Sequence, residues 1–388
     1  MDTHMKTRNS LLALLGVAAL TIYILACSSF SPDDKRIAYP AFDVNSGLIG
    51  ISVYDRDARK TEIAFVPGLS EPADSNASPA MARSQWLPDG KNILVAYGGG
   101  KMSDTELNLA VVPWPARGVV RVFHLTGLSD AGPMLLWPLA VAGDNLFLSS
   151  TESNIVIRLN LKTGQRLAHQ LEVAARNVAL YPGPDGRSIF YLQEAGTPDR
   201  SVTFGSLDPG SFARKPIITF TNQVPEHGFF AWDPPRKRVA FTSDVKNTLG
   251  IIVVEDGKQV FSRSIGSPGL ELQFSRHAFF LKGDVILAAF EQKKPNEKTA
   301  SYGLMEIPLN NAPVRMTTLI PVAESGDELV WYLEPAVSHD GKLAAVSSAY
   351  IAGGLVKPED CALFLVDLSS PQRTVTKIPI PIPLDLPK

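Results

Sequence analysis

The stretch Leu87-Pro88-Asp89-Gly90-Lys91-Asn92-Ile93-Leu94-Val95 joins a polar turn directly to an apolar run. Proline presets the backbone of a first turn position and the Asp-Gly pair favours a tight reversal, so residues 87–91 predict a hairpin turn. The apolar residues that follow are typical of a buried strand. Alone, this unit predicts one hairpin; its repetition decides the fold.

The same unit returns along the whole chain. Full copies stand at residues 31–39 and 183–191, and degenerate copies stand at residues 233–241 and 338–344. Two weaker copies, at residues 143–148 and 283–287, keep only a Gly-Asp pair ahead of an apolar run. Together with the first stretch, the unit occurs seven times.

A second unit, an apolar strand ending in a polar turn and followed by another apolar strand, comes after each copy of the first. Its seven occurrences begin with the apolar runs 51–54, 109–112, 155–158, 202–205, 251–254, 303–306 and 363–366. Successive copies of either unit are 41 to 60 residues apart. This period is the length of a four-stranded unit with its connections.

Two independent patterns that each count seven predict an all-β fold, a seven-bladed β-propeller of four-stranded antiparallel blades over residues 31–388. Six or eight blades remain open, because the third and sixth turns are degenerate. A fold of alternating strands and helices would need long stretches with apolar residues at helical spacing, and the sequence after the N-terminal segment has none of convincing length. A β-sandwich would not explain seven similar units at this period.

The Pro-Asp-Gly-Lys/Arg-x-Ile-x-Phe/Tyr element resembles the PD40 repeat of TolB-like propellers, and it is similar to the repeats of YVTN and WD40-like propellers. The resemblance covers the chain from about residue 31 onward, as a repeat pattern only. It implies a propeller fold. TolB-type proteins carry an α/β domain ahead of the propeller that has no counterpart in this sequence, so the resemblance does not extend to the partners of TolB.

The N-terminus has the pattern of an export signal. Lys6 and Arg8 precede an apolar stretch at residues 11–25, which is shorter than the roughly 20 residues that span a bilayer. The tetrad Ile24-Leu25-Ala26-Cys27 resembles a bacterial lipobox. The resemblance implies a signal peptide at residues 1–26, lipidation of Cys27 by palmitate-type chains, and a short tether at residues 27–30. The alternatives are an uncleaved anchor helix and an ordinary secretory signal.

A lipid on Cys27 has consequences for location and for the second cysteine. Two or three acyl chains hold a protein to a membrane essentially permanently, and Ser28 after the cysteine favours the outer membrane or an outward-facing position in the bacterial cell envelope. Cys361 is then left without a disulfide partner, and its apolar surroundings predict a buried, unreactive thiol.

Ring closure is left open by the sequence. The first turn begins at Ser31, with almost no chain ahead of it to supply an innermost strand for the first blade. The tail at residues 375–384 is a candidate either for the outer strand of the seventh blade or for the missing strand of the first. Its prolines predict an edge position.

Binding is expected on the face opposite the turns, where long connections on a rigid scaffold carry function. The longer connections are residues 67–83, 98–106, 125–135, 291–299, 321–329 and 350–360. The charged residues in these connections are candidates for contact with a protein, peptide or glycan partner. The alternative is that they are solvated loop charges. They are Glu71, Asp74, Lys101, Asp104, Asp130, Glu324, Asp327 and Glu328, with Lys293 and Lys294 as further counter-charges.

Other patterns favour structural roles. Tryptophans 86, 137, 232 and 331 each lie near the strand before a turn, which favours packing between blades over an aromatic ligand platform. The six histidines show no pair at ligand spacing, so we expect no metal site and no cofactor. The formal net charge of -2 argues against nucleic-acid binding, and the basic run at residues 236–238 is interpreted as a solvated turn.

These observations favour a membrane-tethered, non-enzymatic binding scaffold. The alternative is a propeller enzyme, either a lactonase-like hydrolase or a quinoprotein-like oxidoreductase, because residues 184–191 are similar to a motif of seven-bladed lactonases. No cluster of acid, histidine and arginine that such enzymes place at the channel mouth can be located in the sequence, and we assign no catalytic residue.

Overall fold

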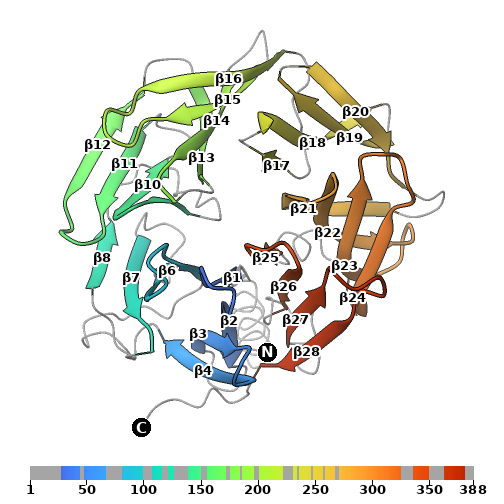
Figure 1. The fold of residues 1–388 in the computed structure, drawn as a ribbon, viewed down its shortest axis with the longest axis horizontal. Helices are drawn as coiled ribbons and strands as arrows, with labels where there is room; N and C mark the ends of the chain where they lie inside the picture. Colours follow the sequence, from blue (N-terminus) through green and yellow to red (C-terminus); the bar gives the residue numbers. More distant parts are fainter. Residues whose placement is uncertain are drawn as a thin grey trace, which may run out of the picture.

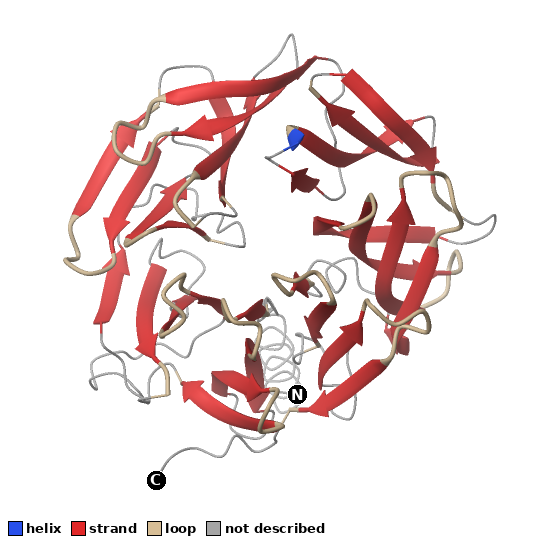
Figure 2. Ribbon diagram, in the orientation of Figure 1, coloured by secondary structure: helices blue, strands red, loops and turns tan. Residues whose placement is uncertain are grey.

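The computed structural model describes residues 28–43, 48–66, 81–98, 107–115, 121–125, 139–149, 155–171, 175–183, 186–195, 201–221, 230–233, 236–245, 248–256, 258–266, 271–324, 335–348 and 362–380. These residues form 28 strands, grouped in fours around a central axis (Figure 1). Strands account for nearly all of the regular structure (Figure 2). The predicted all-β, seven-bladed propeller is confirmed.

The first four blades follow one another along the chain. Blade 1 contains β1 (Ser29–Phe30), β2 (Arg36–Asp43), β3 (Leu48–Asp55) and β4 (Lys60–Phe65). Blade 2 contains β5 (Met81–Trp86), β6 (Asn92–Gly98), β7 (Leu107–Pro113) and β8 (Arg121–Leu125). Blade 3 contains β9 (Ala140–Ala142), β10 (Asn145–Ser149), β11 (Ile155–Asn160) and β12 (Arg166–Gln170). Blade 4 contains β13 (Ala175–Pro182), β14 (Ile189–Ala195), β15 (Ser201–Leu207) and β16 (Arg214–Thr221).

Three more blades complete the ring. Blade 5 contains β17 (Phe230–Asp233), β18 (Arg238–Val245), β19 (Thr248–Glu255) and β20 (Lys258–Ser264). Blade 6 contains β21 (Glu271–Leu281), β22 (Val285–Lys293), β23 (Thr299–Pro308) and β24 (Arg315–Glu324). Blade 7 contains β25 (Ala336–Val337), β26 (Leu343–Ser347), β27 (Ala362–Asp367) and β28 (Val375–Pro379). The chain therefore uses up each blade before it starts the next.

Within every blade the neighbouring strands are antiparallel, and the first strand lies nearest the axis (Figure 1). The sheets of blades 5 and 6 are joined to each other, because β17 and β21 pair in parallel where Phe230 lies opposite His277. The two blades thereby form one eight-stranded sheet. The parallel pairing shows directly that the innermost strands of these neighbouring blades run in the same direction.

The Pro-Asp-Gly turns take the same backbone conformation in several blades. The amide of the fourth turn residue donates to the carbonyl of the first in blades 1, 2, 4 and 7, with donors Asp34, Gly90, Gly186 and Gly341 at N···O distances of 2.8–3.1 Å. All four donors have a positive φ, between 57° and 72°. Glycine adopts this conformation without steric strain, which explains the recurrence of glycine at this position.

A second hydrogen bond ties the two halves of most blades together. The residue at the end of the first turn accepts through its carbonyl from the amide that follows the third strand. The pairs are Lys35 with Arg56, Lys91 with Trp114, Asp144 with Leu161, Lys237 with Asp256, Asp284 with Leu309, and Lys342 with Leu368. The same backbone hydrogen bond therefore joins the two sequence units in six of the blades.

The apolar faces of the blades pack against their neighbours. One buried cluster joins blades 2 and 3, another joins blades 3 and 4, and further clusters join blades 4 with 5 and 5 with 6. The largest cluster runs through blades 6, 7, 1 and 2. Trp86 is 5% exposed in the cluster of blades 1 and 2, and Trp232 packs on Phe190 and Phe204 between blades 4 and 5. For these two tryptophans the predicted role in packing between blades is confirmed, whereas Trp137 and Trp331 lie outside the described residues.

Two of the fourth strands, β12 and β28, differ from the expectation. We predicted an apolar strand after each second turn, but all five residues of β12 are exposed and β28 has only one residue that is not. These strands form the outer edge of the ring, so only one of their faces meets another part of the molecule. In these two blades the second and third strands supply most of the buried apolar residues, whereas other fourth strands do reach the core, as Phe65 of β4 and Ile320 of β24 show.

The ring closes without exchanging a strand between its ends. The innermost strand of blade 1 is β1, which lies directly ahead of the first turn, so the chain does supply it, contrary to the expectation. The tail provides β28, the outer strand of blade 7, and not a strand of blade 1. Ser28 and Phe30 are each 5% exposed, so the propeller begins at residue 28 and not at residue 31.

Candidate functional site

The alternation of strand direction sorts the connections onto two faces. We use the name turn face for the side that carries the connections between the first and second, and between the third and fourth, strands of each blade. The long-connection face carries all the others. Between the described strands, no connection on the turn face exceeds seven residues. Every connection of eight or more, namely 66–80, 99–106, 126–139, 222–229, 325–335 and 348–361, is on the long-connection face.

The predicted site residues fall, in sequence, within or next to the connections of the long-connection face. Glu71, Asp74, Lys101, Asp104, Asp130, Asp327 and Glu328 lie outside the described residues, as do Cys27 and Cys361. Glu324 is the last residue of β24. Whether the predicted site residues come together in one site stays a prediction.

One of the expected long connections is shorter than predicted. Residues 291–293 belong to β22, which leaves only residues 294–298 between β22 and β23. Lys293 is accordingly a strand residue, with a side chain 18% exposed and its Nζ 3.4 Å from a carboxylate oxygen of Glu271. Lys294 remains in the connection and pairs with Glu297 at 3.1 Å.

The carboxylates of the turn face are occupied by the turns themselves. Asp340 accepts from the Lys342 amide at 3.0 Å and from the Ser338 hydroxyl at 2.7 Å, and these bonds lower the pKa of Asp340 to about 2. Asp208 accepts from the amide and hydroxyl of Ser211, which lowers its pKa as well. Such carboxylates stabilise the turns, and their hydrogen-bonding capacity is largely used internally.

The joint between blades 7 and 1, here called the seam, is bridged on the turn face by Asp34. Its carboxylate accepts from the amide of His339 at 2.9 Å and from the amide of Asp340 at 3.1 Å, and it lies 2.8 Å from Nδ1 of His339. The Asp34 side chain is 16% exposed. The first turn of blade 1 thus caps the first turn of blade 7.

The basic run at residues 236–238 was interpreted as a solvated turn, and this is wrong for Arg238. Its side chain is 5% exposed and donates to Asp284 at 2.9 Å and to Asp233 at 3.3 Å. Its guanidinium also lies 4.4 Å above the ring of Phe280. Because Asp284 belongs to blade 6, the run clamps blades 5 and 6 together. Arg238 and Arg236 also lower the pKa of Asp284.

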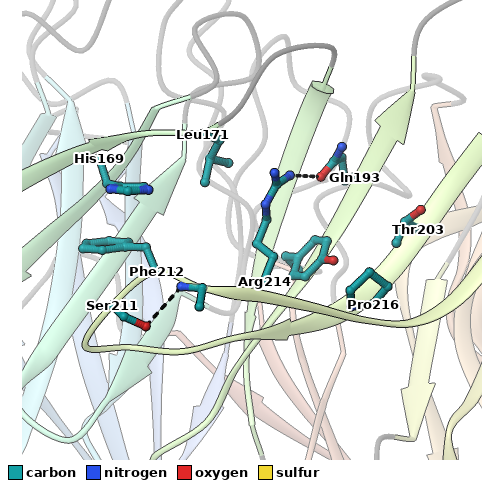
Figure 3. Close-up of a pocket in the computed structure, with 10 residues that line it drawn as sticks. His169, Leu171, Gln193, Thr203, Ser211, Phe212, Arg214 and Pro216 are labelled. Atoms are coloured by element: carbon teal, nitrogen blue, oxygen red, sulfur yellow. Dashed lines mark hydrogen bonds between the residues drawn. The ribbon is translucent and has the colours of Figure 1, made fainter.

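A groove of about 440 Å³ lies between the outer parts of blades 3 and 4. It is lined by His169, Leu171, Tyr191, Gln193, Thr203, Ser211, Phe212, Ala213, Arg214 and Pro216 (Figure 3). The ring of His169 stacks on Phe212, with centroids 4.8 Å apart, and the guanidinium of Arg214 donates to Gln193. The two blades meet here through His169 of β12 and Phe212, which lies in the turn just ahead of β16.

The floor of this groove is tightly built around Gly205. A Cβ added there would lie 2.5 Å from the Lys215 carbonyl oxygen and 2.5 Å from the ring of Tyr191. Burial raises the pKa of Tyr191, and the nearby charge of Arg214 lowers it in part. The lining residues come from β12, β14, β15 and β16, from the turn ahead of β16 and from Leu171, and sequence reasoning missed them. A glycine inside an apparent strand, which often marks close backbone approach, was the one available signal.

The histidines with described side chains have structural partners. His124 is 2.6 Å from Asn108, His169 stacks on Phe212, and His339 pairs with Asp34. Within the part of the chain that the structure describes, no three residues among His, Cys, Asp and Glu are grouped so that they could hold a metal ion. The described residues of the lactonase-like motif form the blade 4 turn, in which Gly186 donates to Gly183.

The comparisons with solved structures agree with the fold. A prolyl endopeptidase matches with a TM-score of 0.56 and 13% identity over 96% of this chain and 52% of its own, so the chain spans about half of that peptidase. An uncharacterised protein from Listeria monocytogenes matches with a TM-score of 0.50 and 11% identity over 91% and 93%. An oligogalacturonate lyase from Vibrio parahaemolyticus matches with 0.46 and 10% over 88% and 84%.

At these identities the likeness shows the propeller fold alone. No protein-family model matches the chain, and no curated protein matches it. Among the described residues there is no helix long and apolar enough to cross a membrane.

Proposed function

We propose that this protein is an exported binding scaffold, held to a membrane through Cys27, that engages a protein, peptide or glycan through its long-connection face. The observation that carries the proposal is the division of the connections: all those of eight residues or more are on one face of a rigid ring. Long connections on a rigid scaffold are where binding residues concentrate.

The turn face is a poorer candidate for binding. Its connections are short, and the carboxylates of Asp34, Asp208 and Asp340 accept hydrogen bonds from neighbouring turns or from their own turn. A partner that bound these groups would have to replace bonds that stabilise the fold. The charged residues predicted for binding, by contrast, belong to the connections of the other face.

Membrane attachment rests on the N-terminal sequence. The apolar segment at residues 11–25 and the Ile-Leu-Ala-Cys tetrad ending at Cys27 support export followed by lipidation. Replacing Cys27 with serine would remove the acylated sulfur. We expect wild-type protein to float with membranes in a density gradient and the Cys27→Ser protein to be released from them.

Binding is tested by exchanging connections. Residues 67–80, 99–106, 126–138, 222–229, 325–334 and 349–361 would each be replaced by five-residue Gly/Ser linkers, the length of the natural connections at 150–154 and 196–200. The matched control replaces turn-face residues 115–120 and 369–372 with Gly/Ser linkers of equal length, which leaves Trp114, Leu368 and Arg373 in place. After crosslinking in the native cells, we expect partner recovery to fall at least tenfold for the first protein only. Undiminished recovery from a folded protein without its long connections would overturn the proposal.

A further inference from the structure

The groove between blades 3 and 4 is a hollow that small residues leave open. On the face of blade 4 that packs against blade 3, Tyr191 lies opposite Gly205 and Gln193 lies opposite Thr203. A Cβ on Gly205 would lie 2.5 Å from the Tyr191 ring, so this ring lies directly against the β15 backbone and forms a floor. The space that remains, about 440 Å³, is in the range of pockets that hold small organic ligands.

The lining of the groove is basic. Of its ten residues, Arg214 and His169 are bases and none is an aspartate or a glutamate. Arg158 adds a guanidinium beside the groove, where it donates to the turn ahead of β16 at 2.9 Å. The acid of that turn, Asp208, accepts from both the amide and the hydroxyl of Ser211 at 2.7 Å. Its carboxylate is therefore held within its own turn, and the charge of the groove favours an anionic ligand.

Arg214 is held in place for such a ligand. Its side chain is half-buried, and its guanidinium donates one hydrogen bond to Oε1 of Gln193 (Figure 3). Its other N–H groups have no partner among the described residues. The charge of Arg214 acts on the Tyr191 hydroxyl, so the two groups lie close together, and burial raises the pKa of Tyr191. This hydroxyl therefore stays protonated at neutral pH and can donate to an anion bound by the guanidinium.

The rest of the lining is largely apolar. Leu171 and Phe212 are buried, and Pro216 lies further along β16. Phe212 has a φ of 62°, which is unfavourable for a bulky residue, and this conformation places its ring in the wall of the groove against His169. The groove thus joins one fixed guanidinium to an apolar wall, which suits a ligand with an anionic group on an apolar body.

We propose that this groove binds a small organic carboxylate, with the carboxylate paired to Arg214 and the apolar body against Leu171 and Phe212. A guanidinium binds a carboxylate through two parallel hydrogen bonds, and the two single charges balance. A phosphate would bring a second charge, for which the lining has no second permanent cation. None of the lining residues belongs to a connection of eight or more residues, so this site is independent of the long-connection face and of Cys27.

The ligand class is tested with N-acetylphenylalanine as the probe. Binding to the full-length chain in mild detergent would be measured by saturation-transfer NMR, with the detergent alone as the blank. We expect a dissociation constant of about 1 mM or below. The amide of N-acetylphenylalanine, which has the same shape without the charge, and inorganic phosphate should each bind at least tenfold more weakly. No saturable binding of the acid, or equal binding of the amide or of phosphate, would overturn the proposal.

The location is tested with variants of the groove. Arg214→Gln removes the charge and keeps a group that can hydrogen-bond to Gln193, so we expect binding to weaken at least tenfold. The matched control is Lys215→Gln, which removes the same charge from an exposed neighbour outside the lining and should change binding less than twofold. Thr203→Phe fills the groove without changing Arg214 and should abolish binding.

Urea unfolding shows which of these variants are folded. Unchanged binding in a folded Arg214→Gln or Thr203→Phe protein would overturn the proposal. An equal loss in the Lys215→Gln protein would also overturn it, because the binding would then depend on overall charge and not on the groove. If Arg214→Gln does not fold, the Thr203→Phe protein decides the question.

Discussion

Asp34 stands where the first turns of blades 2, 4 and 7 have glycine. Its φ of 57° is a conformation that non-glycine residues adopt at a cost of roughly 1 kcal/mol. Its carboxylate accepts hydrogen bonds from two backbone amides of blade 7, and these bonds offset the cost. A residue that is locally unfavourable is therefore explained by its contact across the seam.

The substitution Asp34→Gly separates these two effects. It relieves the backbone but removes the charge-assisted hydrogen bonds, so we expect a net loss of about 1–2 kcal/mol in the free energy of unfolding. The matched control is Arg59→Gly in the same blade, where φ is 51° and only the backbone relief applies, so stability should be unchanged or rise by up to about 1 kcal/mol. Urea unfolding measures both. A stabilised Asp34→Gly protein would show that the seam contact contributes little.

Asp340 lies in the first turn of blade 7 and makes the stability of the protein sensitive to acid. The pKa of its carboxyl is about 2 in the folded protein against a usual value of 3.8, so the folded state favours the ionised form. This contribution to stability is present above pH 3.8 and is lost as the pH falls through about 2. We expect the stability difference between wild type and Asp340→Asn to shrink as urea unfolding is repeated from pH 5 to pH 2. A constant difference over that range would contradict this assignment.

At the scale of strands, the sequence predicted the turns and the buried strands, because local residue types determine where they lie. The turns could be located because proline and Asp-Gly pairs impose their own backbone geometry. The third strands could be located because they are buried. The outer strands could not be predicted as exposed edges, since β12 and β28 resemble other short strands until their neighbours are known.

The candidate site was less predictable than the fold. Its long connections could be placed on one face, because strand alternation alone settles that question. The clamp made by Arg238 could not be predicted, because its partner Asp284 lies in another blade, 46 residues away. The groove residues likewise come together only when blades 3 and 4 pack.

The close packing at Gly205 in β15 gives a prediction for that strand. In Gly205→Ala the new methyl group would meet a backbone carbonyl and the Tyr191 ring at 2.5 Å, so we expect a loss of about 1–3 kcal/mol in the free energy of unfolding. Gly266→Ala is the control, because a Cβ there has no atom within 4 Å, and its effect should stay within about 0.5 kcal/mol. Equal stabilities for the two variants would mean that β15 and β16 can separate freely.

A largely buried, two-pronged ion pair joins β23 to the turn ahead of β28. Arg373 donates from Nε and from a terminal nitrogen to the two carboxylate oxygens of Glu306, both at 2.7 Å, and the two side chains are 15% and 8% exposed. This bond also raises the pKa of Arg373.

Removal of one partner should leave the other charge buried and unpaired. We expect Glu306→Ala to cost about 3 kcal/mol in the free energy of unfolding. Asp144→Ala, which breaks an exposed pair with Lys162 at 2.8 Å, should cost less than about 1 kcal/mol. A double-mutant cycle with Arg373→Ala measures the coupling by urea unfolding, and a coupling near zero would show that the pair does not hold blades 6 and 7 together.

For the whole molecule, the decisive feature is that each blade is a continuous piece of chain. Blades 7 and 1 meet through packing and hydrogen bonds, and no described strand crosses between them. The peptide linkage across that joint is therefore missing, whereas each of the other six joints has one.

Moving the break to another joint should therefore be tolerated. A circular permutant would link residue 388 to Ser28 and begin at Ala175, the first residue of β13. We expect unchanged strand content by circular dichroism and a melting temperature within a few degrees of the unpermuted soluble domain. A permutant that fails to fold would indicate that the native seam requires free ends.

The position of β1 also has a mechanical consequence under the proposed attachment through Cys27. Tension between the membrane and a captured partner would enter the ring at the strand beside its one joint without a covalent link. Such a load would peel blade 1 from blade 7 contact by contact. Rupture under force should therefore start next to the anchor, while the other blades stay folded.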